Sequence, residues 1–120
     1  MNNELMPFQN IISSIKEEGC IENLYISQTI EGFRKLELQI LHSNNSRSFY
    51  VITDNRLTID KRQITIIPFN NMQQRNQEIK RLYLEEKMTQ VFIAKIFRLA
   101  QSTISGIVNS KDPKVIMTRG

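Results

Sequence analysis

The stretch that decides the fold is residues 89–111, TQVFIAKIFRLAQSTISGIVNSK. Its apolar residues recur at intervals of three and four, the spacing that places side chains on one face of an α-helix. Thr89 is a favourable N-cap for one helix, and a second helix follows over about residues 101–109. The stretch therefore predicts two short helices joined by a turn of a few residues.

This stretch resembles the helix-turn-helix of phage repressors and resolvases, and the preceding IKRLYLEEK (residues 79–87) resembles the helix that usually comes before it. When Gln90 is taken as the first position, Ala94 falls where the two helices cross so closely that only a small side chain fits. The resemblance covers about residues 76–111 and implies a trihelical DNA-binding unit. The positions that match the core of the family are Ile93, Ala94, Phe97, Leu99, Ile104 and Ile107.

The resemblance also implies which residues contact DNA. The start of the second helix would read base edges in the major groove, where one good bidentate contact, such as glutamine to adenine, discriminates by roughly 1–3 kcal/mol. Phosphate contacts would set register and affinity without reading sequence. The implied base contacts are Gln101, Ser102, Thr103 and Ser105, and the implied phosphate contacts are Gln90, Lys87, Lys95, Arg98 and Lys111.

Four residues depart from the pattern of the family. Arg98 occupies the turn position that glycine normally holds, so a positive φ there would cost on the order of 1 kcal/mol unless the turn has another geometry. Ala100 replaces the usual hydroxyl cap of the second helix. Gly106 weakens that helix by roughly 0.5–1 kcal/mol relative to alanine, or else allows close approach to DNA. Phe92 is apolar where solvent is expected, which predicts a contact with the N-terminal domain or a second subunit.

Positive charge is concentrated in the C-terminal part of the chain, whose formal net charge is +4 at pH 7. Residues 1–74 contain seven basic and eight acidic residues, whereas residues 75–120 contain nine basic and four acidic ones. The second part therefore carries +5 and the first −1. Such asymmetry is typical of a segment that binds a polyanion.

Composition excludes several classes of function. The chain has 120 residues, 40% of them hydrophobic and 23% charged, as in ordinary soluble globular proteins. No apolar run approaches the roughly 20 residues that a membrane helix needs, and the start MNNELMPFQN lacks the features of a signal peptide. We therefore expect a cytoplasmic protein, in a bacterial cell or a phage-infected host, that has no membrane partner.

Cys20 is the only cysteine and His42 the only histidine. One chain therefore cannot assemble a disulfide framework, a Cys/His zinc site or a histidine-based triad. We expect Cys20 to be a small buried hydrophobe. No metal and no cofactor are predicted, and an enzyme is the weakest alternative because no nucleophile, base or metal cluster is recognisable.

The first part of the chain predicts an α+β domain. Apolar residues at helical spacing after Pro7 predict a helix to about Glu18, with Gly19 as its stop. The pattern then changes to period two, as in LELQI (residues 36–40), which predicts a half-buried strand.

Short connections between the period-two runs of residues 20–69 favour an antiparallel β-meander of four or five strands. RLTID (residues 56–60) and QITIIPF (residues 63–69) are expected to be separate strands. A polar stretch follows Pro68, and we therefore expect an α+β domain over residues 1–70 and a helix-turn-helix domain over residues 71–120.

The expected function is sequence-specific binding of double-stranded DNA by a transcriptional regulator, a repressor of phage or mobile-element type. A single unit of this kind contacts one half-site, so tight binding requires a dimer whose recognition helices lie about 34 Å apart. We assign dimerisation to the N-terminal domain because it has apolar faces and exposed strand edges.

Two other classes of function remain open. In one, the N-terminal domain binds a protein as an inhibitor or adaptor while the helix-turn-helix autoregulates its own gene, as in some anti-CRISPR proteins. In the other, the chain targets DNA for recombination, replication or packaging. A partner bound by the first domain, or a binding site away from promoters, would distinguish these classes.

Overall fold

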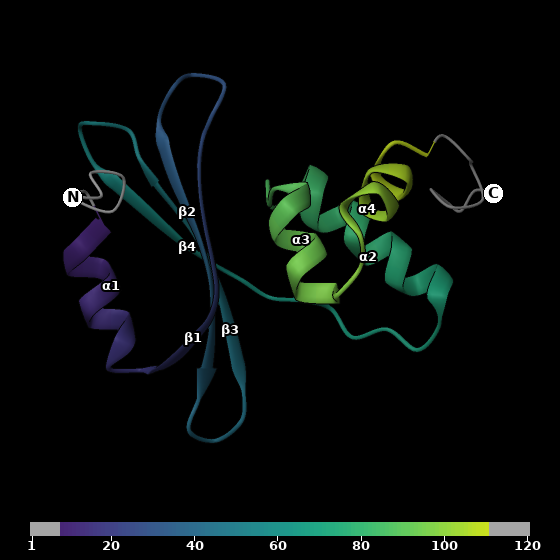
Figure 1. Cartoon of the computed structure of the whole chain (residues 1–120), viewed down its shortest axis with the longest axis horizontal. Helices are drawn as coiled ribbons and strands as arrows, with labels where there is room; N and C mark the ends of the chain where they lie inside the picture. Colours follow the sequence, from purple (N-terminus) through teal and green to yellow (C-terminus); the bar gives the residue numbers. More distant parts are fainter. Residues whose placement is uncertain (1–7, 111–120) are drawn as a thin grey trace. The chain divides into compact units, whose positions relative to one another are not determined.

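The computed structural model describes residues 8–110 and has the predicted α+β fold (Figure 1). A helix and a four-stranded antiparallel sheet precede three further helices. In chain order the elements are α1 (Gln9–Lys16), β1 (Gly19–Gln28), β2 (Arg34–His42), β3 (Arg47–Asp54), β4 (Ile59–Ile64), α2 (Met72–Leu84), α3 (Gln90–Phe97) and α4 (Gln101–Val108).

The chain divides into two compact units, Met1–Thr65 and Ile66–Gly120, a few residues before the boundary expected from the sequence. Contacts with the helices explain the earlier boundary. The Ile67 N–H donates to a carboxylate oxygen of Glu78 in α2 at 2.7 Å. The ring of Phe69 stacks on that of Phe97, with 5.8 Å between the ring centroids. Residues 66–70 therefore belong to the helical unit.

The sheet of the first unit is a meander in which each strand pairs with the next along the chain, in the order β1-β2-β3-β4. One expectation about it is wrong, because β4 runs through residues 59–64 as a single strand instead of being split at Asp60 and Lys61. Its residues pair without interruption from Ile59 to Ile64, so the two charges lie on a continuous ladder.

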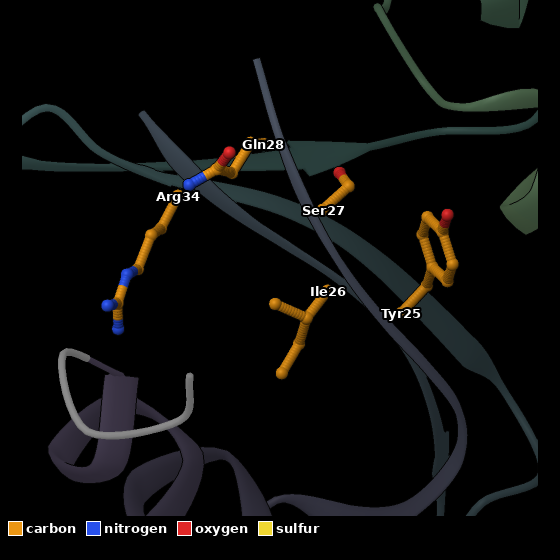
Figure 2. A pocket seen from close by; sticks show the side chains of 5 residues that line it. All are labelled: Tyr25, Ile26, Ser27, Gln28 and Arg34. Atoms are coloured by element: carbon orange, nitrogen blue, oxygen red, sulfur yellow. The ribbon is translucent and has the colours of Figure 1, made fainter. Parts of the chain in front are cut away.

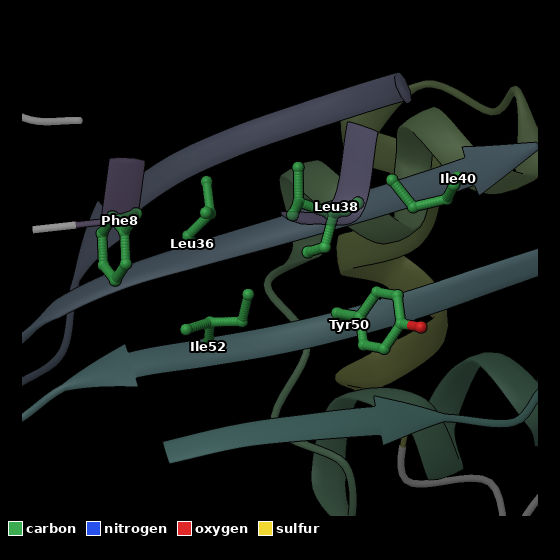
Figure 3. Close-up of a cluster of buried hydrophobic side chains, with 7 residues drawn as sticks. Phe8, Leu36, Leu38, Ile40, Tyr50 and Ile52 are labelled. Carbon is green, nitrogen blue, oxygen red and sulfur yellow. The ribbon is translucent and has the colours of Figure 1, made fainter. Parts of the chain in front are cut away.

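Helix α1 covers one face of the sheet and closes the core of the first unit (Figure 3). The antiparallel register places Leu36 opposite Ile52 and Leu38 opposite Tyr50, so that alternate residues of β2 and β3 share this face. The buried residues of this core are Phe8, Ile15, Leu36, Leu38, Ile40, Tyr50 and Ile52. The period-two pattern of the sequence therefore identified the core face.

A β-bulge lets β1 present a consistent apolar face. The register shifts between Ile21 and Asn23, which leaves Glu22 as the extra residue. Without this insertion, strict alternation would put Ile21 on the opposite face from Leu24 and Ile26. With it, all three pack against the core below α1.

Gly19 begins β1 and does not act as the expected helix stop. The helix ends earlier, at Lys16, and a turn follows it. A Cβ on Gly19 would lie 2.3 Å from the carbonyl oxygen of Leu41 on β2. The glycine is therefore required by the close approach of two strands.

The second strand is buried on both faces, which differs from the half-buried strand expected. Glu37 has no exposed surface, and Gln39 is 8% exposed. The amide of Gln39 accepts a hydrogen bond from Asn23 at 2.7 Å and donates one to Glu22 at 2.8 Å. Polar side chains can occupy this central strand because their hydrogen bonds are satisfied there.

The second unit begins with a capped helix. Asn71 precedes α2, and its side chain accepts a hydrogen bond from the Gln74 N–H at 2.8 Å. The Gln74 side chain in turn accepts from the Asn70 N–H at 2.8 Å. The two bonds form a capping pair in which the return bond reaches the residue before the cap.

Within residues 8–110, no single helix is long and apolar enough to cross a membrane. The pair α3 and α4 meets the length and composition criteria only when the two are taken together, and a bend of 115° separates them.

Candidate nucleic-acid interface

Helices α3 and α4 meet at a sharp corner formed by residues 98–100. Their axes are bent by 115°, within the range of about 90–120° for two helices joined by a short turn. Arg98 caps α3 in the left-handed conformation, with φ 57° and ψ 44°. The N–H groups of Arg98 and Leu99 both donate to the carbonyl oxygen of Ala94. The turn therefore has the glycine-type geometry although its residue is arginine.

The six predicted core positions all turn away from solvent to some degree. Ile93, Ala94 and Ile104 are buried, whereas Phe97, Leu99 and Ile107 are half-buried. Ala94 lies immediately before the corner, where its carbonyl receives both capping bonds. Further buried apolar residues of the unit that sequence reasoning did not assign are Ile79, Leu82, Met88 and Val108.

The exposed face of α4 is the candidate surface for base contacts. Gln101, Ser102 and Thr103 are exposed in the first turn, and Ser105 is half-buried one turn later. Ile104 and Val108 are buried on the opposite side. At 100° per residue, the direction opposite the buried side passes through positions 102, 106 and 109. Ser105 flanks this ridge on one side and Thr103 on the other, whereas Gln101 lies toward the buried side and is exposed because it begins the helix.

Asn109 is a polar residue of this ridge that the sequence reasoning missed. It is exposed, and its side-chain amide donates to the Ser105 hydroxyl at 3.2 Å. Its position follows from the helical repeat, since it lies seven residues after Ser102. It was not predicted because the resemblance implies base contacts only in the first half of the helix.

Helix α4 begins without a side-chain cap and contains a glycine, which is a weak helix-forming residue. Ala100 has no side-chain cap hydrogen bond, as its alanine side chain predicts. A Cβ added to Gly106 would meet no atom within 4 Å, so packing within the chain does not require glycine there. Both residues leave the solvent side of this helix free of bulk.

The candidate phosphate contacts lie just before α3, on α3 and in the turn between α3 and α4. Lys87, Lys95 and Arg98 are exposed, and Gln90 is half-buried at the first position of α3. In the described part of the chain, no hydrogen bond joins the side chains of Gln90 and Gln101. Lys111, the remaining predicted phosphate contact, lies outside the described residues.

The Thr89 cap predicted for α3 is confirmed. Its hydroxyl accepts a hydrogen bond from the Phe92 N–H at 3.1 Å. Phe92 itself has no exposed surface within one chain. The buried ring leaves no surface for a second subunit, and the alternative contact with the N-terminal domain stays a prediction.

Among the described residues of the helical unit, the acidic groups lie on α2 and just after it. No Asp or Glu occurs from Lys87 to Ser110. Arg81 makes two hydrogen bonds of 2.7 and 2.8 Å to the carboxylate of buried Glu78, and one of 2.8 Å to Glu86. The hydrogen bonds that Arg81 donates to the Glu78 carboxylate raise the pKa of Arg81 above its ordinary value. These two carboxylates are thus neutralised locally.

In the first unit, the lone histidine has a structural position. His42 lies 2.7 Å from the Ser48 hydroxyl through Nε2 and 3.1 Å from the Glu18 carbonyl oxygen through Nδ1. Since a carbonyl only accepts, Nδ1 carries the proton. The ring therefore joins β2 and β3 to the turn after α1. Cys20, expected to be buried, is exposed.

Within the described residues, no group of three or more His, Cys, Asp or Glu side chains is arranged to hold a metal ion. Comparisons of the chain with protein-family models, with curated proteins and with solved structures found no match.

Proposed function

We propose that the helical unit is a helix-turn-helix that binds double-stranded DNA in a sequence-specific manner. The observation that carries the proposal is the ridge of α4. It presents uncharged amide and hydroxyl side chains on a helix that leaves its predecessor at 115°. A helix held at such a corner can enter the major groove while the preceding helix crosses the backbone.

The charges around this ridge support the proposal. Lys87, Lys95 and Arg98 are exposed on and beside α3, and no acidic residue occurs between Lys87 and Ser110. Cations in these places would lie near phosphates and release counterions on binding. Amides and hydroxyls would then meet base edges at a favourable orientation.

In this proposal the protein is a cytoplasmic transcriptional regulator that acts as a dimer on an operator, with occupancy of the operator causing repression. The first unit supplies the contact between the two copies. A phage or mobile element has a compact set of genes, which a small dimeric regulator would suffice to control. The origin expected from the sequence therefore belongs to the same proposal.

The decisive experiment begins with capture and sequencing of fragmented genomic DNA by the purified full-length chain. Binding to the enriched site and to a scrambled duplex is then measured over a range of salt concentrations. Gln101→Ala should reduce the preference for the site by about 1–3 kcal/mol with little effect on the scrambled duplex.

Lys95→Ala should weaken binding to both duplexes and lower the slope of log K against log salt by about 0.9. Lys16→Ala is the matched control, because Lys16 is an exposed lysine at the end of α1 in the other unit. If the parent chain enriches no sequence, or if Gln101→Ala and Lys95→Ala both bind like Lys16→Ala, the proposed function is wrong.

A further inference from the structure

The two edges of the sheet differ in how well they are protected against pairing with another strand. The β4 edge has six residues, and three successive ones, Asp60, Lys61 and Arg62, are charged. The β1 edge has ten residues, and its last six, Asn23–Gln28, carry no charge and no proline. Charges, short length and β-bulges protect an edge strand, so the bulge at Glu22 protects the start of β1 and leaves its last six residues open to pairing.

A hollow of about 500 Å³ lies along the unprotected edge (Figure 2). It is lined by Tyr25, Ile26, Ser27, Gln28 and Arg34. Successive residues of a strand point to opposite faces, so Ile26 and Ser27 belong to different faces of the sheet. The hollow therefore reaches both faces of the sheet at the last residues of β1, beside Arg34 at the start of β2.

The direction of the backbone groups follows from the first hairpin. The Thr29 N–H donates to the Phe33 carbonyl at 2.8 Å, so this residue of the turn faces β2. Because inward and outward groups alternate along an antiparallel ladder, the N–H groups of Ile26 and Gln28 point away from β2. These two residues therefore offer donors and acceptors at the edge.

Ser27, between those two residues, has an unsatisfied polar atom. Its hydroxyl oxygen is buried and has no hydrogen-bond partner among the described residues. Buried polar atoms without a partner are rare in folded proteins, and each one calls for an explanation. The oxygen is closed to water in this rotamer, so a second hydroxyl at this edge provides the partner only when the Ser27 side chain turns toward it about χ1.

We propose that a second copy of the chain pairs antiparallel with β1 about a two-fold axis at Ser27, which joins two sheets into one of eight strands. In this register Ile26 exchanges both backbone hydrogen bonds with Gln28 of the partner subunit. Ser27 then faces Ser27 of the partner subunit in the close, non-hydrogen-bonded position, where paired hydroxyls stabilise a sheet. The pairing serves the dimer of the proposed function but does not require DNA.

The first test compares proline substitutions at two exposed edge glutamines, by sedimentation equilibrium without DNA. Gln28→Pro removes an outward N–H on β1. Gln63→Pro removes the equivalent on β4, where the hydrogen bond from Asn55 to Thr58 fixes the same alternation. Proline is tolerated at an edge whose N–H faces outward, so both variants should fold. The parent and Gln63→Pro should be dimers, and Gln28→Pro should be monomeric.

The second test fixes the register and does not depend on tolerance of proline. In a Cys20→Ser background, Ser27→Cys should form a disulfide-linked dimer under mild oxidation, because Cα atoms in a non-hydrogen-bonded pair lie about 4.5 Å apart, within reach of a disulfide. Gln63→Cys in the same background is the control and should remain uncrosslinked.

A parent chain that is monomeric at every concentration, or equal crosslinking of the two cysteine variants, would overturn the edge pairing. These outcomes are separate from those for DNA. A dimer that crosslinks at position 27 but prefers no DNA sequence refutes the proposed function alone. A monomer that still distinguishes its site from scrambled DNA refutes the edge pairing alone.

Discussion

In the helical unit, Arg98 and Gly106 are among the residues that conflict with their local backbone. Arg98 has a left-handed conformation that favours glycine, and Gly106 lies inside a helix where its missing Cβ would meet nothing within 4 Å. Each choice costs roughly 0.5–1 kcal/mol relative to the residue that the backbone prefers. Gly106 lies on the α4 ridge and Arg98 in the turn before α4, and local conflicts of this kind concentrate at functional sites.

Gly106→Ala should therefore raise stability and lower DNA affinity. Alanine should stabilise α4 by about 0.5–1 kcal/mol because it restricts the unfolded chain and suits the helix. Its methyl group would lie on the centre of the ridge, where the DNA must approach. Thermal unfolding measures the first effect and titration of the selected site measures the second. A variant that is more stable and binds as the parent does would remove Gly106 from the interface.

Replacements of Arg98 separate strain from charge. Arg98→Gly should relieve the left-handed conformation and stabilise the unit by up to about 1 kcal/mol, whereas Arg98→Gln should not. Both remove one cation, so both should reduce the salt slope of DNA binding by about 0.9. Unfolding and binding of the two variants side by side distinguish these contributions. Salt slopes equal to that of the parent would show that Arg98 contacts no phosphate.

Sequence reasoning located the turn residue because Arg98 stands where glycine is usual. It left open whether the turn has a positive φ there or another geometry, and the structure has the positive φ. Sequence reasoning could not identify the unsatisfied Ser27 hydroxyl. Serine in a strand has no distinctive pattern, and the missing partner is visible only when neighbouring atoms are placed. Asn109 was missed for a different reason, since its relation to Ser102 depends on helix phase over two turns.

Helix α2 contains a buried ion pair whose removal should destabilise the second unit. Glu78 is 5% exposed and also accepts the Ile67 N–H, so loss of Arg81 leaves a buried carboxylate without its cation. Arg81→Ala should cost about 3 kcal/mol by urea unfolding.

The matched control is Arg75→Ala, because Arg75 is half-buried on the same helix and donates to Asn76. It should change stability by only about 0.5 kcal/mol. Adding Glu78→Gln to Arg81→Ala should restore part of the loss. A double variant no more stable than Arg81→Ala would show that the uncompensated charge is not the cause.

The helices and strands were largely predictable because each has one dominant period. The bulge in β1 was not, since CIENLYIS satisfies a two-residue repeat only after Glu22 is set aside, and the sequence does not say which residue to omit. Burial on both faces of β2 was also missed. Glu37 and Gln39 are residue types that usually face solvent. Their burial is possible only because polar neighbours offset the free energy of removing them from water.

At the largest scale the chain consists of two compact units. The two proposals assign DNA binding to the second unit and dimerisation to the first, so both apply to the complete dimer. The edge-pairing variant Gln28→Pro should retain the base preferences of α4 and bind a single half-site as the parent does. It should lose the gain that two linked sites give, about 10²–10⁴-fold in affinity for the full operator.

Titration of one-half-site and two-half-site duplexes with the parent and Gln28→Pro measures this loss, and Gln63→Pro is again the control. Equal affinity of the parent for the two duplexes would mean that its two DNA-binding units do not act together. A loss of base preference in Gln28→Pro would mean that the sheet edge influences the helical unit directly.

The fold tolerates substitution at Gly106 but not at Gly19, so the two positions should differ in how they vary during evolution. At Gly19 any side chain would place a carbon 2.3 Å from the Leu41 carbonyl oxygen. The fold therefore excludes substitutions at this position, whatever the protein recognises. At Gly106 the fold permits other residues, and only the demands of recognition restrict them. Lineages that change their target sequence should therefore vary at position 106 while position 19 stays glycine.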